Sequence, residues 1–225
     1  PSQWHAHEMI YGYSMAVIAG FLLTAVRNWT QIQTPQGKPL IVLFSLWLTA
    51  RILFFFGTRF VLPAAILDLC FILFLTVAIL YPIIKARQWH QLEVVAKLVF
   101  LAVGQVVFYL GVWGHLQRGV YWGLYGGLYL LIGLVMMMGA RLIPNFIQNG
   151  VGYQVQLYHP KWIAVASLLL YLMFFISELF LNSDNFTSVV SAGLFVVISI
   201  RLIGWHTHGI WKKPLLWSLF LSFIF

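Results

Sequence analysis

The feature that most constrains the fold of this chain is a series of long apolar runs with very few charges. Hydrophobic residues make up 62% of the 225 residues and charged residues only 8%. A water-soluble domain of this size shows more polar surface than that. Seven runs are long enough to cross a bilayer as helices, and they cover about residues 8–27, 39–58, 61–84, 91–113, 119–140, 161–181 and 186–205. An eighth run begins near Pro214 and continues to the end of the chain.

These runs predict helices and not strands, because backbone polar groups in lipid must be satisfied within the spanning segment. The alternation that a membrane β-barrel needs is absent from the sequence. We therefore expect an all-α, polytopic transmembrane helical bundle that forms a single domain over residues 1–225. The chain starts at Pro1 without a methionine and stops at Phe225 inside an apolar run. This predicts a piece truncated at both ends relative to a longer parent.

Basic residues are unevenly distributed over the predicted loops, and this predicts the orientation. The odd-numbered loops carry eight of them: Arg27, Lys38, Lys85, Arg87, Arg141, Lys161, Lys212 and Lys213. The even-numbered loops carry two, Arg59 and Arg118. The positive-inside rule then places the odd-numbered loops in the cytoplasm, with His5 and His7 on the outer side. The net charge of +8 thus reflects topology and contacts with the lipid bilayer, and because the cations are scattered we expect no nucleic acid partner.

Two charged residues lie well inside predicted spans. Arg51 and Asp68 are equidistant from the centre of the loop that joins their helices. In an antiparallel pair they would sit at matching depth, about 12 Å from the outer end at the rise of an α-helix. A buried charge at that depth is costly unless it is paired, which favours an Arg51–Asp68 ion pair. The alternatives are that Arg51 serves a buried anion such as a haem propionate, or that both residues and Glu178 line the path of a proton-coupled or small-molecule transporter.

Three potential metal ligands, His5, His7 and Glu8, stand directly before the first apolar run. Imidazole and carboxylate groups at a membrane helix entrance usually have a partner or a function, and a metal or haem would provide one. Residues two apart on a helix point about 200° away from each other. His5 and His7 therefore cannot ligate one ion from a regular helix, whereas His7 and Tyr11 share a face.

Four segments, in order along the chain, resemble the NnrS family. They are WHAHEM at 4–9, AGFLLTAVRNWT at 19–30, GARLIPNF at 139–146 and PLLW at 214–217. The first is the most specific, and the set spans nearly the whole chain. The resemblance implies a bacterial inner-membrane protein of about twelve spans that contains haem and copper. It also implies a role in the nitric oxide response, in nitrosative-stress tolerance and in denitrifying bacteria, with nitric oxide or a related small molecule as its partner.

The resemblance also assigns residues. His5, His7 and Glu8 become the metal-site candidates, while Asn28 and Arg141 match polar positions of the family and join Arg51 as cofactor-binding candidates. The chain departs from the family pattern at three places. Tyr109 and Phe220 stand where a histidine is expected, and Asn145 stands where a phenylalanine is expected. No motif of the sequence indicates a catalytic nucleophile, a phosphate loop or a cysteine-rich zinc site.

Overall fold

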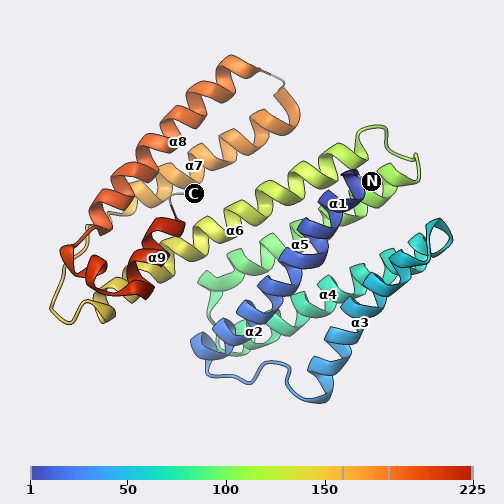
Figure 1. Cartoon of the computed structure of the whole chain (residues 1–225), viewed down its shortest axis with the longest axis horizontal. Coiled ribbons are helices and arrows are strands. Elements are labelled where there is room, and N and C mark those ends of the chain that lie inside the picture. The colour runs from blue at the N-terminus through green and yellow to red at the C-terminus, as the bar shows by residue number, and fades with distance from the viewer. Residues whose placement is uncertain (1, 159, 182, 224–225) are drawn as a thin grey trace. The chain divides into compact units, whose positions relative to one another are not determined.

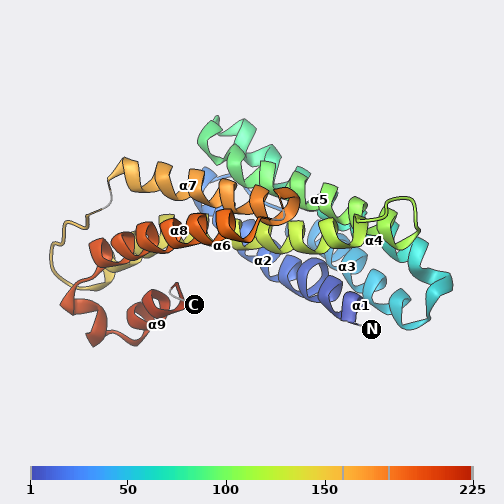
Figure 2. The same ribbon diagram turned by 90° about the horizontal axis from the view of Figure 1, so that it is seen from above.

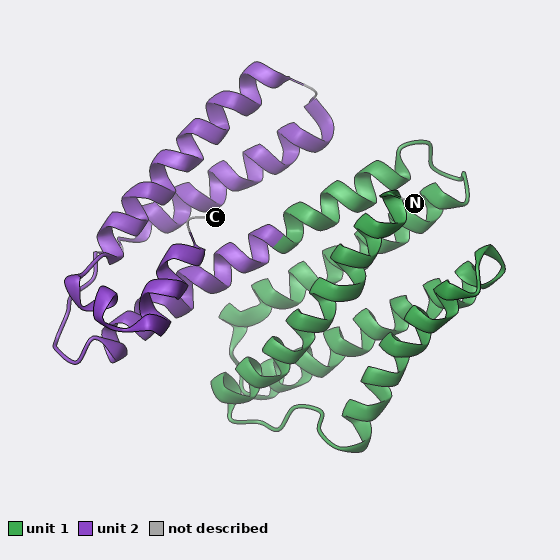
Figure 3. Cartoon of the chain, viewed as in Figure 1, with its two compact units in different colours: residues 1–131 green, residues 132–225 purple. Residues whose placement is uncertain are grey.

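The computed structural model describes residues 2–158, 160–181 and 183–223, and every regular element in these ranges is helical. Pro1 and Phe225, the chain ends discussed above, lie outside the described residues. Within them, seven helical segments are long and apolar enough to cross a membrane, which confirms the predicted multi-pass helical fold. The chain divides into two compact units, unit 1 at residues 1–131 and unit 2 at residues 132–225 (Figure 3).

Unit 1 contains the first four spans and the beginning of the fifth. Its elements are α1 (Ser2–His7), the π-helical segment η1 (Glu8–Ser14), α2 (Met15–Thr30), α3 (Lys38–Phe55), the 3₁₀ turn η2 (Thr58–Phe60), α4 (Val61–Lys85), the 3₁₀ turn η3 (Trp89–Gln91), α5 (Leu92–Val112) and the first part of α6 (Gly119–Gly150). The segments α1, η1 and α2 follow one another without a break and form one long rod (Figures 1 and 2). The WHAHEM segment is therefore helical, and the first span begins earlier than the predicted residue 8.

A tight turn brings α3 and α4 together as antiparallel neighbours (Figure 1). The turn contains Gly57, whose φ of 88° is strained for residues with a side chain. The turn is short, so residues equally far from it lie opposite each other on the two helices. This register is what sets Arg51 against Asp68.

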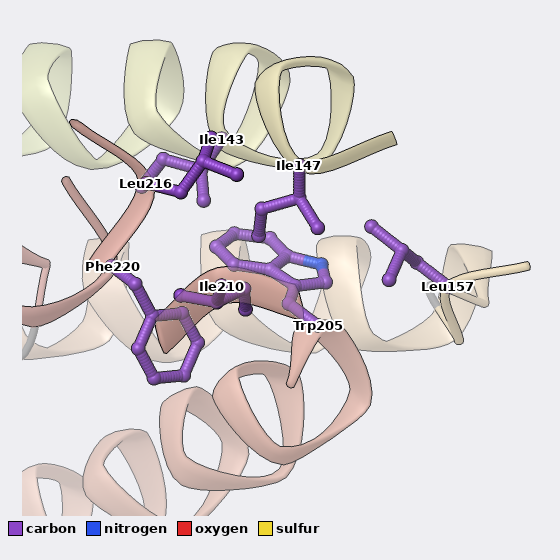
Figure 4. Close-up of a cluster of buried hydrophobic side chains, with 7 residues drawn as sticks. All are labelled: Ile143, Ile147, Leu157, Trp205, Ile210, Leu216 and Phe220. Atoms are coloured by element: carbon purple, nitrogen blue, oxygen red, sulfur yellow. The ribbon is translucent and has the colours of Figure 1, made fainter. Parts of the chain in front are cut away.

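Unit 2 contains the rest of α6 and four further elements. These are α7 (Lys161–Ile176), the π-helical segment η4 (Ser177–Leu181), α8 (Asp184–Trp205), the 3₁₀ turn η5 (His208–Lys212) and α9 (Pro214–Ser222). A buried apolar cluster packs elements of this unit together at one of its ends (Figure 4). Its members are Ile143, Ile147, Leu157, Trp205, Ile210, Leu216 and Phe220.

The fifth span is longer than predicted. We expected an end near residue 140, ahead of the charge on Arg141, but α6 continues through Pro144 to Gly150. The reason is visible in Figure 4, where Ile143 and Ile147, one helical turn apart, both point into the apolar cluster. Burial of this stripe stabilises the extra turns despite the proline and the charge.

Candidate functional site

His7 is the most deeply enclosed polar residue of unit 1, with no exposed surface. Its ring is stacked between Phe108, at 4.5 Å between centroids, and Trp4, at 5.2 Å. Its Nδ1 lies 3.1 Å from Oε1 of Glu8. Its Nε2 is buried without a hydrogen-bond partner and faces Oδ2 of Asp68 at 3.8 Å. The structure thus fixes one ring nitrogen on a carboxylate and leaves the other available.

A local widening of the first helix positions these groups. The π-helical segment η1 starts at Glu8, directly after His7, and π-turns inside helices are frequent at functional sites. The hydroxyl of Ser14 donates to the Met9 carbonyl at 2.7 Å, and the Trp47 indole N–H donates to the Gly12 carbonyl at 2.9 Å. These two bonds help to satisfy carbonyls in the irregular turn.

Gly12 leaves the space that Arg51 occupies beside this segment. A Cβ atom built there would overlap Nη1 of Arg51 and lie 3.1 Å from Oε2 of Glu8. The missing side chain therefore provides the space through which Arg51 reaches across from α3 to the first helix.

Arg51 joins the two carboxylates of the site. Its Nη1 donates to Oε2 of Glu8 at 2.9 Å, and its Nη2 donates to Oδ1 of Asp68. The predicted Arg51–Asp68 ion pair is thus confirmed. The other oxygen of Asp68 accepts hydrogen bonds from Nε2 of Gln105 at 2.7 Å and from the Tyr109 hydroxyl at 3.1 Å. One guanidinium faces two carboxylates, so the cluster holds an excess of one negative charge when the imidazole is neutral.

Three predicted site residues, His7, Glu8 and Arg51, are brought together by this geometry. His5 is not part of the cluster, because it lies on the regular helix α1 with its side chain exposed. This agrees with the spacing argument that two histidines at i and i+2 face different directions. Within the described residues no group of three or more His, Cys, Asp or Glu side chains is arranged to hold a metal ion.

The structure places Asn28 and Arg141, the other two predicted cofactor-binding residues, in different units. Asn28 is exposed near the far end of α2, about 30 Å along the helical rod from His7 at the rise of an α-helix. Arg141 belongs to unit 2, where its carbonyl accepts a hydrogen bond from Asn145 Nδ2 at 2.9 Å. Asn28 therefore does not belong to the cluster around His7.

Sequence reasoning missed Gln105 and Tyr109 as members of the site. Both project from the same face of α5, four residues apart in an otherwise apolar stretch, and both are buried. That pair was a usable signal, since polar groups in a membrane helix need partners. Tyr109 also occupies a position where a histidine was expected, and its ring lies 5.3 Å from that of His7.

Close packing of the first helix against α5 and α6 also supports the cluster around His7. The Tyr11 hydroxyl donates to the Gly123 carbonyl at 2.6 Å, and its ring contacts that of His7 at 5.2 Å, as the shared face predicted. Gly104 and Gly127 leave room for the phenol, because a Cβ at either position would crowd its oxygen. The Gly-x-x-x-Gly spacing from Gly123 to Gly127 is thus used for packing within the chain.

Comparison with known families agrees with this picture. The family model described as NnrS protein matches residues 1–225. The chain belongs to the NnrS family. Neither the curated proteins nor the solved structures gave a match. The NnrS assignment covers both units, and with the seven candidate spans it identifies a multi-pass membrane protein.

Proposed function

We propose that this NnrS-family chain is a haem- and copper-binding protein of the nitric oxide response in the bacterial inner membrane, with His7 as a copper ligand. The observation that carries the proposal is the orphaned, buried Nε2 of His7, whose opposite nitrogen is held by Glu8. Metal-ligating imidazoles characteristically have their second nitrogen on a carboxylate or carbonyl, which fixes the ring and raises its basicity. The predicted orientation, with odd-numbered loops in the cytoplasm, places this site near the periplasmic face.

Two groups at His7 suit a copper ion in charge and in donor type, and the remaining ligands would have to come from outside the described residues. Imidazole suits copper, and Oδ2 of Asp68 stands 3.8 Å from Nε2 across the gap. A bound cation would also offset the excess negative charge of Glu8 and Asp68 over Arg51. When bound, copper would supply a coordination position for nitric oxide or a related small molecule. The protein would orient the imidazole through Glu8 and exclude water with Trp4 and Phe108.

The residues around His5 do not fit haem in the same way. His5 is exposed on the surface of α1, so the described part of unit 1 would not enclose a porphyrin bound to it. A haem would therefore need contacts from other parts of the protein. The alternative function, a proton-coupled or small-molecule transporter that uses Arg51, Asp68 and Glu178, stays a prediction.

Replacement of His7 by alanine is expected to remove most of the copper from the full-length protein. The assay is copper per polypeptide, measured by mass spectrometry of protein purified from copper-replete cells. Glu8→Gln should keep the His7 ligand but weaken the hydrogen bond that orients its ring. We expect a 10- to 100-fold lower copper affinity. His115→Ala, a change in an exposed loop, is the matched control and should leave copper content unchanged.

His5→Ala provides the sharper test of the geometry. Because His5 and His7 point to different sides of α1, His5→Ala should leave copper in place while His7→Ala removes it. Equal copper loss in both variants would show that the two histidines share one centre, and full copper content in His7→Ala would refute the assignment.

A further inference from the structure

Unit 2 contains a second buried cation, Arg201 on α8, which is only 7% exposed. Its Nη2 donates to the Ser167 hydroxyl at 2.9 Å and to the Ile163 carbonyl at 3.3 Å, and its Cζ lies 5.9 Å from the centroid of the Trp205 ring. All three partners are neutral. Arg201 forms no ion pair with any of the described residues. A buried guanidinium without a counter-charge is costly, so an anion bound at this position would stabilise it.

The contacts of Arg201 lie near the start of α7, away from the acidic residues of the described part of unit 2. Ile163 lies in the first turn of α7, which begins at Lys161 and has no side-chain cap. The Ile163 N–H donates to the Pro160 carbonyl at 3.1 Å, and it is the Ile163 carbonyl that faces Arg201. The described acidic residues of unit 2, Glu178 and Asp184, lie at the opposite ends of the α7 and α8 segments. Glu178 is the nearer of the two to Ile163 along the chain, and at the rise of a helix the two residues are about 22 Å apart.

Neighbouring aromatic residues place this end of unit 2 at the level of lipid headgroups. Trp162 on α7 and Trp211 on η5 are about half exposed, at 52% and 49%, and exposed tryptophans are typical of the membrane–water interface. The indole N–H of Trp205, within the apolar cluster of Figure 4, is buried without an acceptor. Lys212 and Lys213 follow in the adjacent loop. The loop charges predict that this end faces the cytoplasm, where anionic lipids attract basic groups near the membrane.

We propose that Arg201 binds a phosphate group at this end of unit 2. The planar fork of a guanidinium suits two phosphate oxygens at once. An anionic lipid headgroup and free phosphate share this chemistry. The interfacial tryptophans favour the lipid.

The test uses the full-length protein in detergent and measures its unfolding temperature. Dioleoyl phosphatidylglycerol should raise this temperature in a concentration-dependent way, and dioleoyl phosphatidylcholine should raise it less. Arg201→Gln should lower the apparent affinity for phosphatidylglycerol about 10- to 100-fold, as expected for loss of charged hydrogen bonds. A separate titration with inorganic phosphate identifies the source. If it reproduces the Arg201-dependent shift, the ligand is free phosphate, and if it does not, the ligand is the lipid.

Two control variants separate binding from helix packing. Arg118→Gln removes an exposed arginine at the other end of α6 and should respond to phosphatidylglycerol as the unmodified protein does. Ser167→Ala removes a neutral partner of Arg201 but keeps the cation, so lipid affinity should be retained. An unchanged lipid response in Arg201→Gln, or an equal loss in Ser167→Ala, would overturn the proposal. If Arg201→Gln does not fold, Arg201→Lys serves instead: a weaker response supports the guanidinium site, and an unchanged one contradicts it.

Discussion

Replacing Arg51 with methionine is expected to destabilise the protein by about 3–5 kcal/mol, the usual cost of leaving a buried charge without its partner. Arg51 is the guanidinium that faces both Glu8 and Asp68. Asp68 is only 1% exposed and cannot turn to water. Methionine keeps much of the side-chain length but leaves the two carboxylates without the cation that they share. The loss should appear as a large fall in unfolding temperature and in the yield of monodisperse protein in detergent.

A double-variant comparison shows whether the effect comes from charge. Adding Asp68→Asn to Arg51→Met removes one of the two unpaired carboxylates, so part of the lost stability should return. Arg59→Met is the matched control, because this arginine is exposed in the turn between α3 and α4. It should change the unfolding temperature little. A double variant no more stable than Arg51→Met alone would mean that Arg51 acts mainly through packing.

The Arg51–Asp68 pair was predictable from the sequence because it follows from register alone. A short turn between two apolar helices fixes which residues lie opposite each other, and a buried charge then needs the charge that faces it. The spans were predictable for a similar reason, since length and hydrophobicity determine them directly. The direction of His5 away from His7 follows from the period of a helix.

The remaining parts of the site depend on contacts that register does not determine. The π-helical turn after His7 receives hydrogen bonds from Arg51, Trp47 and Ser14, and no pattern in the first span shows this. Gln105 enters the site only because α5 packs against α4, which the sequence does not specify. The extension of α6 beyond residue 140 likewise depends on the apolar cluster of unit 2.

Alanine at Gly123 is expected to be the other strongly damaging change, with a loss of about 3 kcal/mol from overpacking. A Cβ there would lie 2.5 Å from Cβ, 2.6 Å from Cα and 2.7 Å from the backbone nitrogen of Phe108. Two of these atoms belong to the backbone of α5, so the strain cannot be relieved by turning a side chain. The helices α5 and α6 would have to move apart instead.

Separation of α5 and α6 should also affect the site, because Phe108 covers one face of His7 and the Gly123 carbonyl holds the Tyr11 hydroxyl. We therefore expect Gly123→Ala to lower the unfolding temperature and the copper content together. Gly20→Ala is the matched control, since a Cβ on this helical glycine of α2 meets nothing within 4 Å. Alanine favours a helix by up to about 1 kcal/mol over glycine, so this variant should be neutral or slightly more stable. Similar unfolding temperatures for the two variants would show that α5 and α6 are not in close contact at Gly123.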